Sequence, residues 1–255
     1  MHDHSANHPY HLLECCVDST ASAFAAYRGG ADRLELCGNL IIGGTTPSLS
    51  LFRSIRRECN IRIHALIRPR FGDFLYSEDE VRMMEEDIEA FRDAGAEGVV
   101  IGALTPDGDL DSEILARLIS HAGSMHLTLH RAFDMCREPE RALENACQLG
   151  FHTILTSSQA NSCLDGIPLL NRLCTKADGR LDIMAGAGVN AAVIKKLLSE
   201  TKLHTFHMSG KQVVNSGMVY RNPAVSMGLP GLDEYSIWQT DEAKIRKAKT
   251  VLEEH

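Results

Sequence analysis

The sequence has no surplus of positive charge: 26 lysines and arginines stand against 34 aspartates and glutamates, which gives a formal net charge of -8. A protein that binds nucleic acid or an anionic membrane surface needs cations to neutralise phosphates. The chain also lacks any apolar run near the roughly 20 residues that span a bilayer. Its opening, MHDHSANHPYH, lacks the apolar core of a signal peptide. We therefore expect a cytoplasmic protein with no nucleic-acid or membrane partner.

Cysteine occurs eight times in 255 residues, too sparsely for a disulfide scaffold, and no two cysteines form a C-x-x-C pair. The sequence therefore predicts reduced thiols rather than disulfides or a zinc ribbon. Residues 1–11 carry four histidines, a composition that is typical of a flexible tail and that can also collect metal ions. The expected organisation is this histidine-rich tail and one globular domain over residues 12–255. We expect the domain to end in an irregular loop over residues 220–232 and a helix over residues 241–254.

Short β-branched or leucine-rich runs recur eight times and alternate with amphipathic stretches. The runs begin near Leu12, Arg33, Ile61, Gly98, His126, Thr153, Asp182 and His204. Helix signals lie between them: Ser77 followed by Glu80 predicts a capping box. Further N-caps are expected at Ser48, Asp111 and Asn190. Eight βα units without a linker rich in proline or glycine favour a single closed (β/α)8 barrel of the TIM type, an α/β fold.

Two of the predicted strands place a carboxylate and a thiol inside the barrel. Along a barrel strand, side chains alternate between the helix layer and the interior. In the second strand the two leucines face the helices, so Glu35 and Cys37 point inward. The same alternation in the first strand sends Glu14 and Cys16 inward, because a carboxylate facing the helix layer would be buried without a partner. Both strands are therefore expected to end with a thiol on the pocket side.

Polar side chains of three further strands share this inward direction. They are His64, Arg68 and Arg70 from the third strand, His130 from the fifth, and His207 and Ser209 from the eighth; Arg131 and Asp134 follow His130 along the chain. A core built only for stability does not need so many charges, since each is costly to desolvate unless it is paired. The pattern indicates a functional pocket at the carboxyl ends of the strands. A structural network of carboxylates, arginines and histidines is the alternative.

A glycine turn follows the seventh predicted strand and leads into a helix. Backbone N–H groups at Gly186 and Gly188, with those at Ser209 and Gly210 after the eighth strand, are placed to bind an anion, as in the phosphate sites of other barrels. Tight turns without a ligand use glycine in the same way, so the turn by itself leaves both interpretations open.

Cys16 and Cys37 end neighbouring strands, whose axes lie about 5 Å apart in a sheet. Two soft thiolates at low coordination number suit Cu(I), whereas zinc takes four ligands and hard cations take oxygen. The spacing therefore predicts a Cu(I) site. Two ordinary interior cysteines are the alternative.

Nine motifs in order along the chain resemble the CutC copper homeostasis family. They are ECCVDS at 14–19, GADRLELC at 30–37, GGTTPS at 43–48, IRPR at 67–70, GDFLYS at 72–77, HRAFDM at 130–135, LTS at 155–157, MAGAGV at 184–189 and YRN at 220–222. The resemblance implies a TIM-type barrel, a cytosolic location, a dimer or tetramer, and copper handling with Cu(I) on Cys16 and Cys37. Two loop positions depart from the family pattern, because Phe71 and Ser158 stand where glycine is usual.

Two functions stay open for the polar pocket, beside a structural or interaction barrel with a vestigial pocket, which the polar interior disfavours. In the first, implied by the resemblance, Cys16 and Cys37 bind Cu(I) and the other pocket groups tune access to it. In the second, the protein is an enzyme that acts by proton transfer on a small anionic substrate such as a phosphorylated sugar. Its expected catalytic residues are Glu14, Glu35, His64, His130 and Asp134. Its expected anion-binding residues are Arg68, Arg70, Arg131, Ser157, Gly186, Gly188, His207, Ser209 and Gly210.

Overall fold

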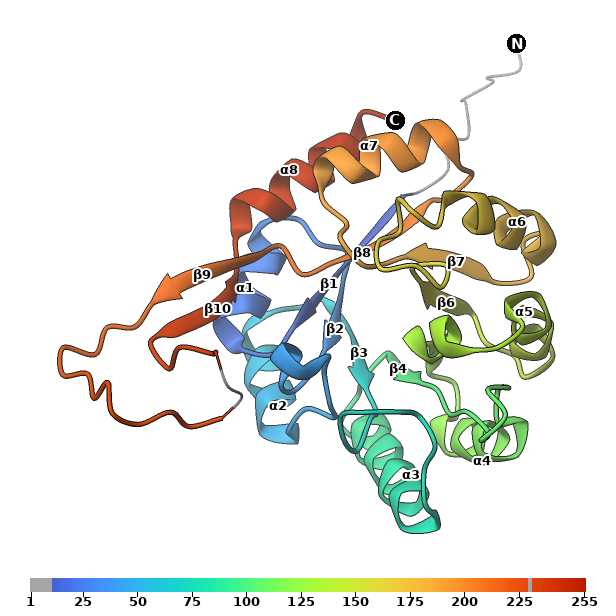
Figure 1. The fold of residues 1–255 in the computed structure, drawn as a ribbon, viewed down its shortest axis with the longest axis horizontal. Coiled ribbons are helices and arrows are strands. Elements are labelled where there is room, and N and C mark those ends of the chain that lie inside the picture. Colours follow the sequence, from blue (N-terminus) through green and yellow to red (C-terminus); the bar gives the residue numbers. More distant parts are fainter. Residues whose placement is uncertain (1–10, 229–230) are drawn as a thin grey trace.

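The computed structural model describes residues 11–228 and 231–255, and its centre is a closed barrel of eight parallel strands in chain order (Figure 1). The strands are β1 Leu12–Val17, β2 Arg33–Leu36, β3 Arg62–Leu66, β4 Gly98–Ile101, β5 His126–Leu129, β6 Thr153–Thr156, β7 Asp182–Ala185 and β8 Thr205–Met208. The ring closes because β1 pairs with both β2 and β8. The predicted (β/α)8 fold is confirmed, and every predicted strand start lies within one residue of the observed start. The predicted histidine-rich tail lies outside the described residues, apart from His11.

Helices surround the barrel (Figure 1). They are α1 Thr20–Arg28, α2 Leu49–Glu58, α3 Glu78–Asp93, α4 Ser112–Ala122, α5 Pro139–Gln148, α6 Ile167–Ala177, α7 Ala191–Glu200 and α8 Glu242–Glu253, with short 3-10 turns η1 Leu40–Ile42 and η2 Arg131–Met135. The capping box is confirmed, since Ser77 accepts from Glu80 N and Glu80 accepts from Ser77 N. Ser48, Asp111 and Asn190 also cap their helices as predicted. Among the described residues, none of these helices has the length and apolar character of a membrane-spanning segment.

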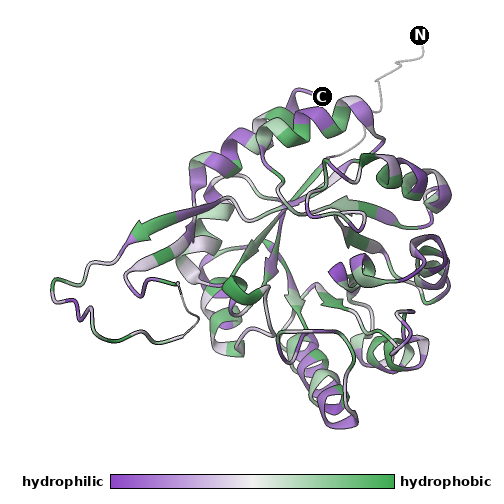
Figure 2. Cartoon of the chain, viewed as in Figure 1, coloured by the Kyte–Doolittle hydropathy of each residue, from purple (hydrophilic) through white to green (hydrophobic). Residues whose placement is uncertain are grey.

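The main apolar core lies between the strands and the helices. In Figure 2 hydrophobic and hydrophilic residues are interspersed along the outer helices, as expected for helices with one face on a barrel. Leu13 and Cys15 of β1 belong to this layer and are fully buried. Cys16 of the same strand lies in a separate small cluster with Cys37 and Leu66. The strand thus divides its side chains between the helix layer and the barrel interior.

Two glycines of the fourth βα unit make room for histidine rings from neighbouring strands. A Cβ atom at Gly98 would lie 2.6 Å from Cδ2 of His64, and one at Gly102 would lie 2.5 Å from Cε1 of His130. Contacts this short do not occur between real side chains, so Gly98 at the start of β4 and Gly102 directly after β4 stay without side chains. The imidazoles of His64 in β3 and His130 after β5 occupy the space beside these two glycines.

An antiparallel hairpin, β9 Lys211–Asn215 and β10 Ser236–Thr240, follows the barrel and projects from it (Figure 1). The sequence predicted an irregular loop over residues 220–232, which lies in the connection between the two strands, but it did not predict the strands themselves. The predicted terminal helix is confirmed as α8, and its Ile245 is fully buried in the main core.

Candidate functional site

A cavity of about 300 Å³ lies at the carboxyl ends of the strands. Of the residues predicted for the site, it is lined by Cys16, Glu35, Arg68, His130, Arg131, Gly188, His207 and Ser209. The others are not among its lining residues: Glu14, Cys37, His64, Arg70, Asp134, Ser157, Gly186 and Gly210. The cavity is at the end of the barrel where proteins of this fold bind their ligands.

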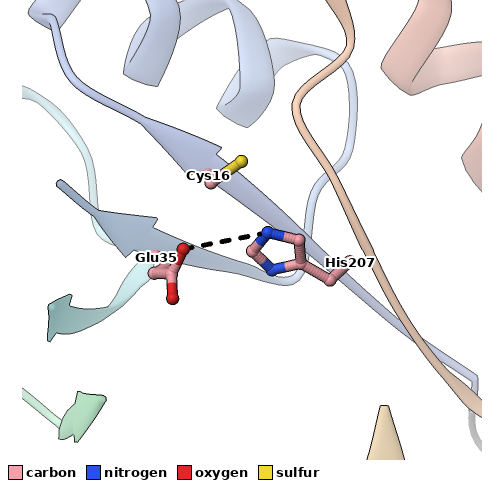
Figure 3. Close-up of side chains that lie close together, drawn as sticks. All are labelled: Cys16, Glu35 and His207. Atoms are coloured by element: carbon pink, nitrogen blue, oxygen red, sulfur yellow. Dashed lines mark ion pairs between the residues drawn. The ribbon is translucent and has the colours of Figure 1, made fainter. Parts of the chain in front are cut away.

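Three side chains of adjacent strands converge on one wall of this cavity (Figure 3). One ligand atom each of Cys16, Glu35 and His207 lies within 4.8 Å of the other two. Cys16 and Glu35 are paired across β1 and β2, while His207 comes from β8 on the other side of β1. Cys16 and Glu35 are buried and His207 is half-buried. A thiol, a carboxylate and an imidazole at this spacing are a set of donors that can hold a metal ion.

Glu14 orients the imidazole of His207. Its Oε1 lies 2.8 Å from His207 Nδ1, so that the other nitrogen, Nε2, faces Glu35 Oε2 at 3.8 Å. Burial lowers the pKa of His207, but Cys16, Glu35 and Glu14 outweigh it and raise the pKa well above the ordinary value. Metal-binding histidines are usually held in this way, with a carboxylate on one ring nitrogen and the other nitrogen directed at the remaining ligands.

Arg33 is an interior residue that the sequence analysis did not select. Its Nε lies 2.5 Å from Glu14 Oε2, and only 3% of the residue is exposed. Burial raises the pKa of Glu14, but the Arg33 guanidinium and His207 hold it below the ordinary value. Arg33 has the same parity as Glu35 in β2, and this signal was available in the sequence. Inside the barrel, Arg33, Glu14 and His207 form one buried charged network.

Cys37 lies near Cys16 but outside the group of three. Its Sγ is 3.4 Å from Glu35 Oε2, and the residue is fully buried. Burial and the Glu35 carboxylate raise the pKa of Cys37 well above the ordinary value. Burial also raises the pKa of Glu35. Cys37 is therefore a neutral thiol that donates to Glu35.

Arg68 and His130 line the cavity from β3 and β5. Arg68 is 7% exposed and donates to the carbonyls of Gly43, Gly44 and Gly72. The Nδ1 of His130 accepts a hydrogen bond from Ala132 N at 3.1 Å. Burial and the charge of Arg68 lower the pKa of His130 to about 3. The imidazole of His130 is therefore neutral in the physiological range.

Asp134, predicted as catalytic, braces a loop in this structure. Its carboxylate accepts from the Ser157 N and Oγ, from Gln159 N and from Arg131 Nε, at 2.7 to 3.1 Å. Thr156 Oγ1 donates to it as well. These donors come from η2 and from the loop after β6, so the carboxylate holds the two segments together. Ser157 and Arg131 take part in the same network, since Arg131 also donates to Ser157 Oγ.

We expect Asp134→Ala to lower the free energy of unfolding by about 2–3 kcal/mol, because several buried donors lose a charged acceptor. Asp134→Asn should lose less, since the amide oxygen still accepts. Urea denaturation of both variants measures the effect. Asp79→Ala is the matched control, because its carboxylate pairs with Arg82 on an exposed helix face. Equal stability of Asp134→Ala and the wild type would show that the network carries no stability.

The remaining predicted residues have packing or bracing roles in this structure. Arg70 pairs with Glu80 at 2.6 Å and with Asp73 at 3.0 Å, which fixes the loop after β3. Gly186 and Gly210 leave space for apolar neighbours, because added Cβ atoms would lie 2.6 Å from Leu155 Cδ1 and 2.7 Å from Ile245 Cδ1.

His64 lies deeper in the barrel, where its ring centroid is 4.9 Å from that of His126. Burial and Arg33 lower the pKa of His64 well below the ordinary value.

Of the two positions that depart from the family pattern, Ser158 adopts a φ of 57°, in the left-handed region that favours glycine. Phe71 lies in the loop after β3 with 64% of its surface exposed.

Comparison with known proteins relates this chain to a single family over most of its length. A family model described as the CutC family matches residues 11–212. The chain is 45% identical to a CutC family protein of Pasteurella multocida, over 95% of this chain and 99% of that protein. It is 42% identical to the human copper homeostasis protein cutC homolog, over 94% of this chain and 88% of that protein. A crystal structure of the putative copper homeostasis protein CutC from Streptococcus agalactiae superposes with a TM-score of 0.75 at 30% identity, and the match covers 78% of this chain and 98% of that one.

Proposed function

The chain belongs to the CutC family, and from this premise we propose that it takes part in copper homeostasis by binding Cu(I) at Cys16. The observation that supports the proposal most is the convergence of Cys16, Glu35 and His207 on one wall of the cavity, with a ligand atom of each within 4.8 Å of the others. The similar human protein is named for copper homeostasis.

The donor set suits a soft monovalent ion. Thiolate and imidazole are ligands that Cu(I) accepts at low coordination number, whereas Glu35 offers a harder oxygen. We therefore propose Cys16 and His207 as the principal ligands. Cys37 is the third candidate, because its sulfur lies beside Glu35 and it shares an interior cluster with Cys16. Glu14 does not bind the ion itself but holds the His207 ring in position through a hydrogen bond to Nδ1.

An anaerobic titration of the purified protein with Cu(I) against a competing chromophoric chelator tests this proposal. We expect one Cu(I) per chain in the wild type. Cys16→Ser should weaken binding by more than about 100-fold, the upper end of what loss of an outer-shell partner costs, because it removes a ligand itself. His207→Phe, which removes the other principal ligand and keeps a ring, should show a loss of similar size.

Two further variants complete the titration. Cys147→Ser is the matched control, because this half-buried thiol lies on α5, away from the cavity. It should bind Cu(I) like the wild type. Cys37→Ser tests whether Cys37 is a third ligand. Weaker Cu(I) binding by this variant would indicate a three-ligand site, and unchanged binding would indicate a site of Cys16 and His207 alone. Equal affinity of the wild type and Cys16→Ser, or no Cu(I) binding by the wild type, would overturn the proposal.

We also infer a cytoplasmic location and a homo-oligomer, a dimer or tetramer. Eight free cysteines support a reducing compartment, and the oligomer follows from the family resemblance. Light scattering of the purified protein measures its mass, and a mass of one chain would contradict the second inference.

A second candidate function is favoured by the composition of the cavity wall. Arg68 and His130 line the same space as Glu35, and Cu(I) binding gives neither of them a purpose. We therefore keep as an alternative proposal that the protein is an enzyme transferring a proton to or from a small anionic substrate.

A further inference from the structure

We propose that the β3 and β5 side of the cavity is a binding subsite for an oxyanion, the carboxylate or phosphate group of a small molecule, with Arg68 and His130 as its donors. The subsite does not involve the metal ligands. Those come from β8, β1 and β2, whereas Arg68 follows β3 and His130 follows β5.

Arg68 is a buried cation beside the cavity. This residue is 7% exposed, and its hydrogen bonds go to the backbone carbonyls of three loop glycines. In residues 11–228 and 231–255, no carboxylate oxygen lies within 4.0 Å of its guanidinium, whereas Arg33, Arg70 and Arg131 each have a carboxylate partner. Tyr76 supplies no charge either, since burial raises its pKa to about 12.

A buried cation without a counter-ion is costly, because it has lost its hydration and gained only dipoles in return. Arg68 lines the cavity, so an anion that enters this space can reach the vicinity of the guanidinium. The missing counter-charge of Arg68 is therefore best supplied by a ligand.

His130 supplies a buried hydrogen-bond donor. Because Nδ1 accepts from Ala132 N, the proton of the neutral ring is on Nε2. This Nε2 is buried and has no hydrogen-bond partner among the described residues. An unpaired buried donor costs about 1–3 kcal/mol. The low pKa of His130 keeps the ring in this neutral, donating form at physiological pH. A donor in this position calls for an acceptor, not for a cation.

The two donors belong to one rigid side of the cavity. The ring centroid of Phe74 lies 4.9 Å from the Arg68 guanidinium and 4.9 Å from the ring centroid of His130. All three residues line the cavity, whose volume of about 300 Å³ suits a small molecule rather than a polymer. His64 also has an unpaired ring nitrogen, but it does not line the cavity and is not part of the subsite.

Isothermal titration calorimetry of the full chain without metal, with inorganic phosphate and separately with acetate, tests the subsite. We expect saturable binding of at least one of the two, with one site per chain. Binding of phosphate alone, acetate alone or both identifies the preferred oxyanion. Arg68→Met should weaken binding by at least about tenfold, since a charge-assisted contact is lost. Arg28→Met is the matched control: this arginine is on α1, is paired with Glu242 on the surface and does not line the cavity. It should bind like the wild type.

His130→Phe keeps the ring and removes the donor, and it should weaken binding by about fivefold, the worth of one neutral hydrogen bond. If Arg68→Met does not fold because its carbonyl contacts are lost, His130→Phe alone decides. The anion titration depends on Arg68 and His130, and the Cu(I) titration depends on Cys16 and His207, so this inference and the copper proposal can fail separately. Absence of saturable binding of both anions to the wild type, or an equal loss in Arg28→Met and Arg68→Met, would overturn the inference.

Discussion

Replacing Arg33 with methionine is expected to lower the free energy of unfolding by about 3–5 kcal/mol, because it removes the guanidinium partner of the buried Glu14 carboxylate. Glu14 has no exposed surface, and its Oε2 lies 2.5 Å from Arg33 Nε. His207 then remains as its one charged neighbour at hydrogen-bond distance. Equilibrium unfolding in urea, followed by circular dichroism under reducing conditions, measures the loss.

A double substitution identifies the cause of this loss. Glu14→Gln removes the charge but keeps an acceptor for His207, so Arg33→Met combined with Glu14→Gln should be more stable than Arg33→Met alone. Arg28→Met is the matched control, because its partner Glu242 is on the surface and the arginine side chain is 58% exposed. Exposed pairs contribute about 0–1 kcal/mol. Should Arg33→Met and Arg28→Met lose equal stability, the interior ion pair would have no special role.

Acidification from pH 7 to pH 4 is expected to destabilise the fold by several kcal/mol, with about 3 kcal/mol of it from His130 alone. The pKa of His130 is lowered to about 3 by burial and by Arg68, while an unfolded histidine titrates near 6.5. Between these values the unfolded chain binds a proton that the folded protein does not. Stability therefore rises with pH through this window and falls on acidification. Burial and Arg33 lower the pKa of His126 to about 4, which adds to the effect.

Urea unfolding at pH 7 and pH 4 measures this dependence, and His130→Phe isolates the contribution of one ring. The difference between the two pH values should shrink by about 3 kcal/mol in this variant. His255→Phe, at the exposed C-terminus, should keep the wild-type difference. His207 acts in the opposite direction, because its raised pKa favours the folded state below pH 6.5. If His130→Phe keeps the wild-type difference in stability between pH 7 and pH 4, then His130 of the wild type is protonated in the folded protein at pH 4, which would contradict its low pKa.

Periodicity predicted the barrel well because it is a property of local sequence. Each strand of a TIM-type barrel is a short run that is apolar on its outer side, and each run is separated from the next by a helix with its own caps. The eight runs therefore stood out, and the helix caps at Ser48, Ser77, Asp111 and Asn190 were recognisable. The hairpin escaped prediction because its strands are joined by residues 216–235 rather than by a short turn with a sequence signal.

The site was predictable only as far as strand alternation reaches. Alternation indicated the inward direction of Glu14, Cys16 and Glu35, and the structure brings Cys16 and Glu35 to one wall with His207. Strand alternation could not indicate which polar side chains pair with loop residues instead of facing the cavity. Asp134 and Arg70 are such groups, and their partners depend on loop conformations that leave no periodic trace in the sequence. Whether a polar residue binds a ligand or holds a loop in place can be decided only from its contacts in the three-dimensional structure.

Gly98 of β4, which has no side chain beside the ring of His64, limits the order in which positions 64 and 98 can be substituted. Because a Cβ atom at Gly98 would lie 2.6 Å from the ring of His64, a lineage cannot enlarge position 98 while the imidazole is in place. It must first lose the ring, and this step leaves a void in the barrel until the second change follows. Neither single step is neutral, so we expect the two positions to be exchanged together or not at all. The His64 ring is thereby retained for packing reasons that do not depend on what the cavity binds.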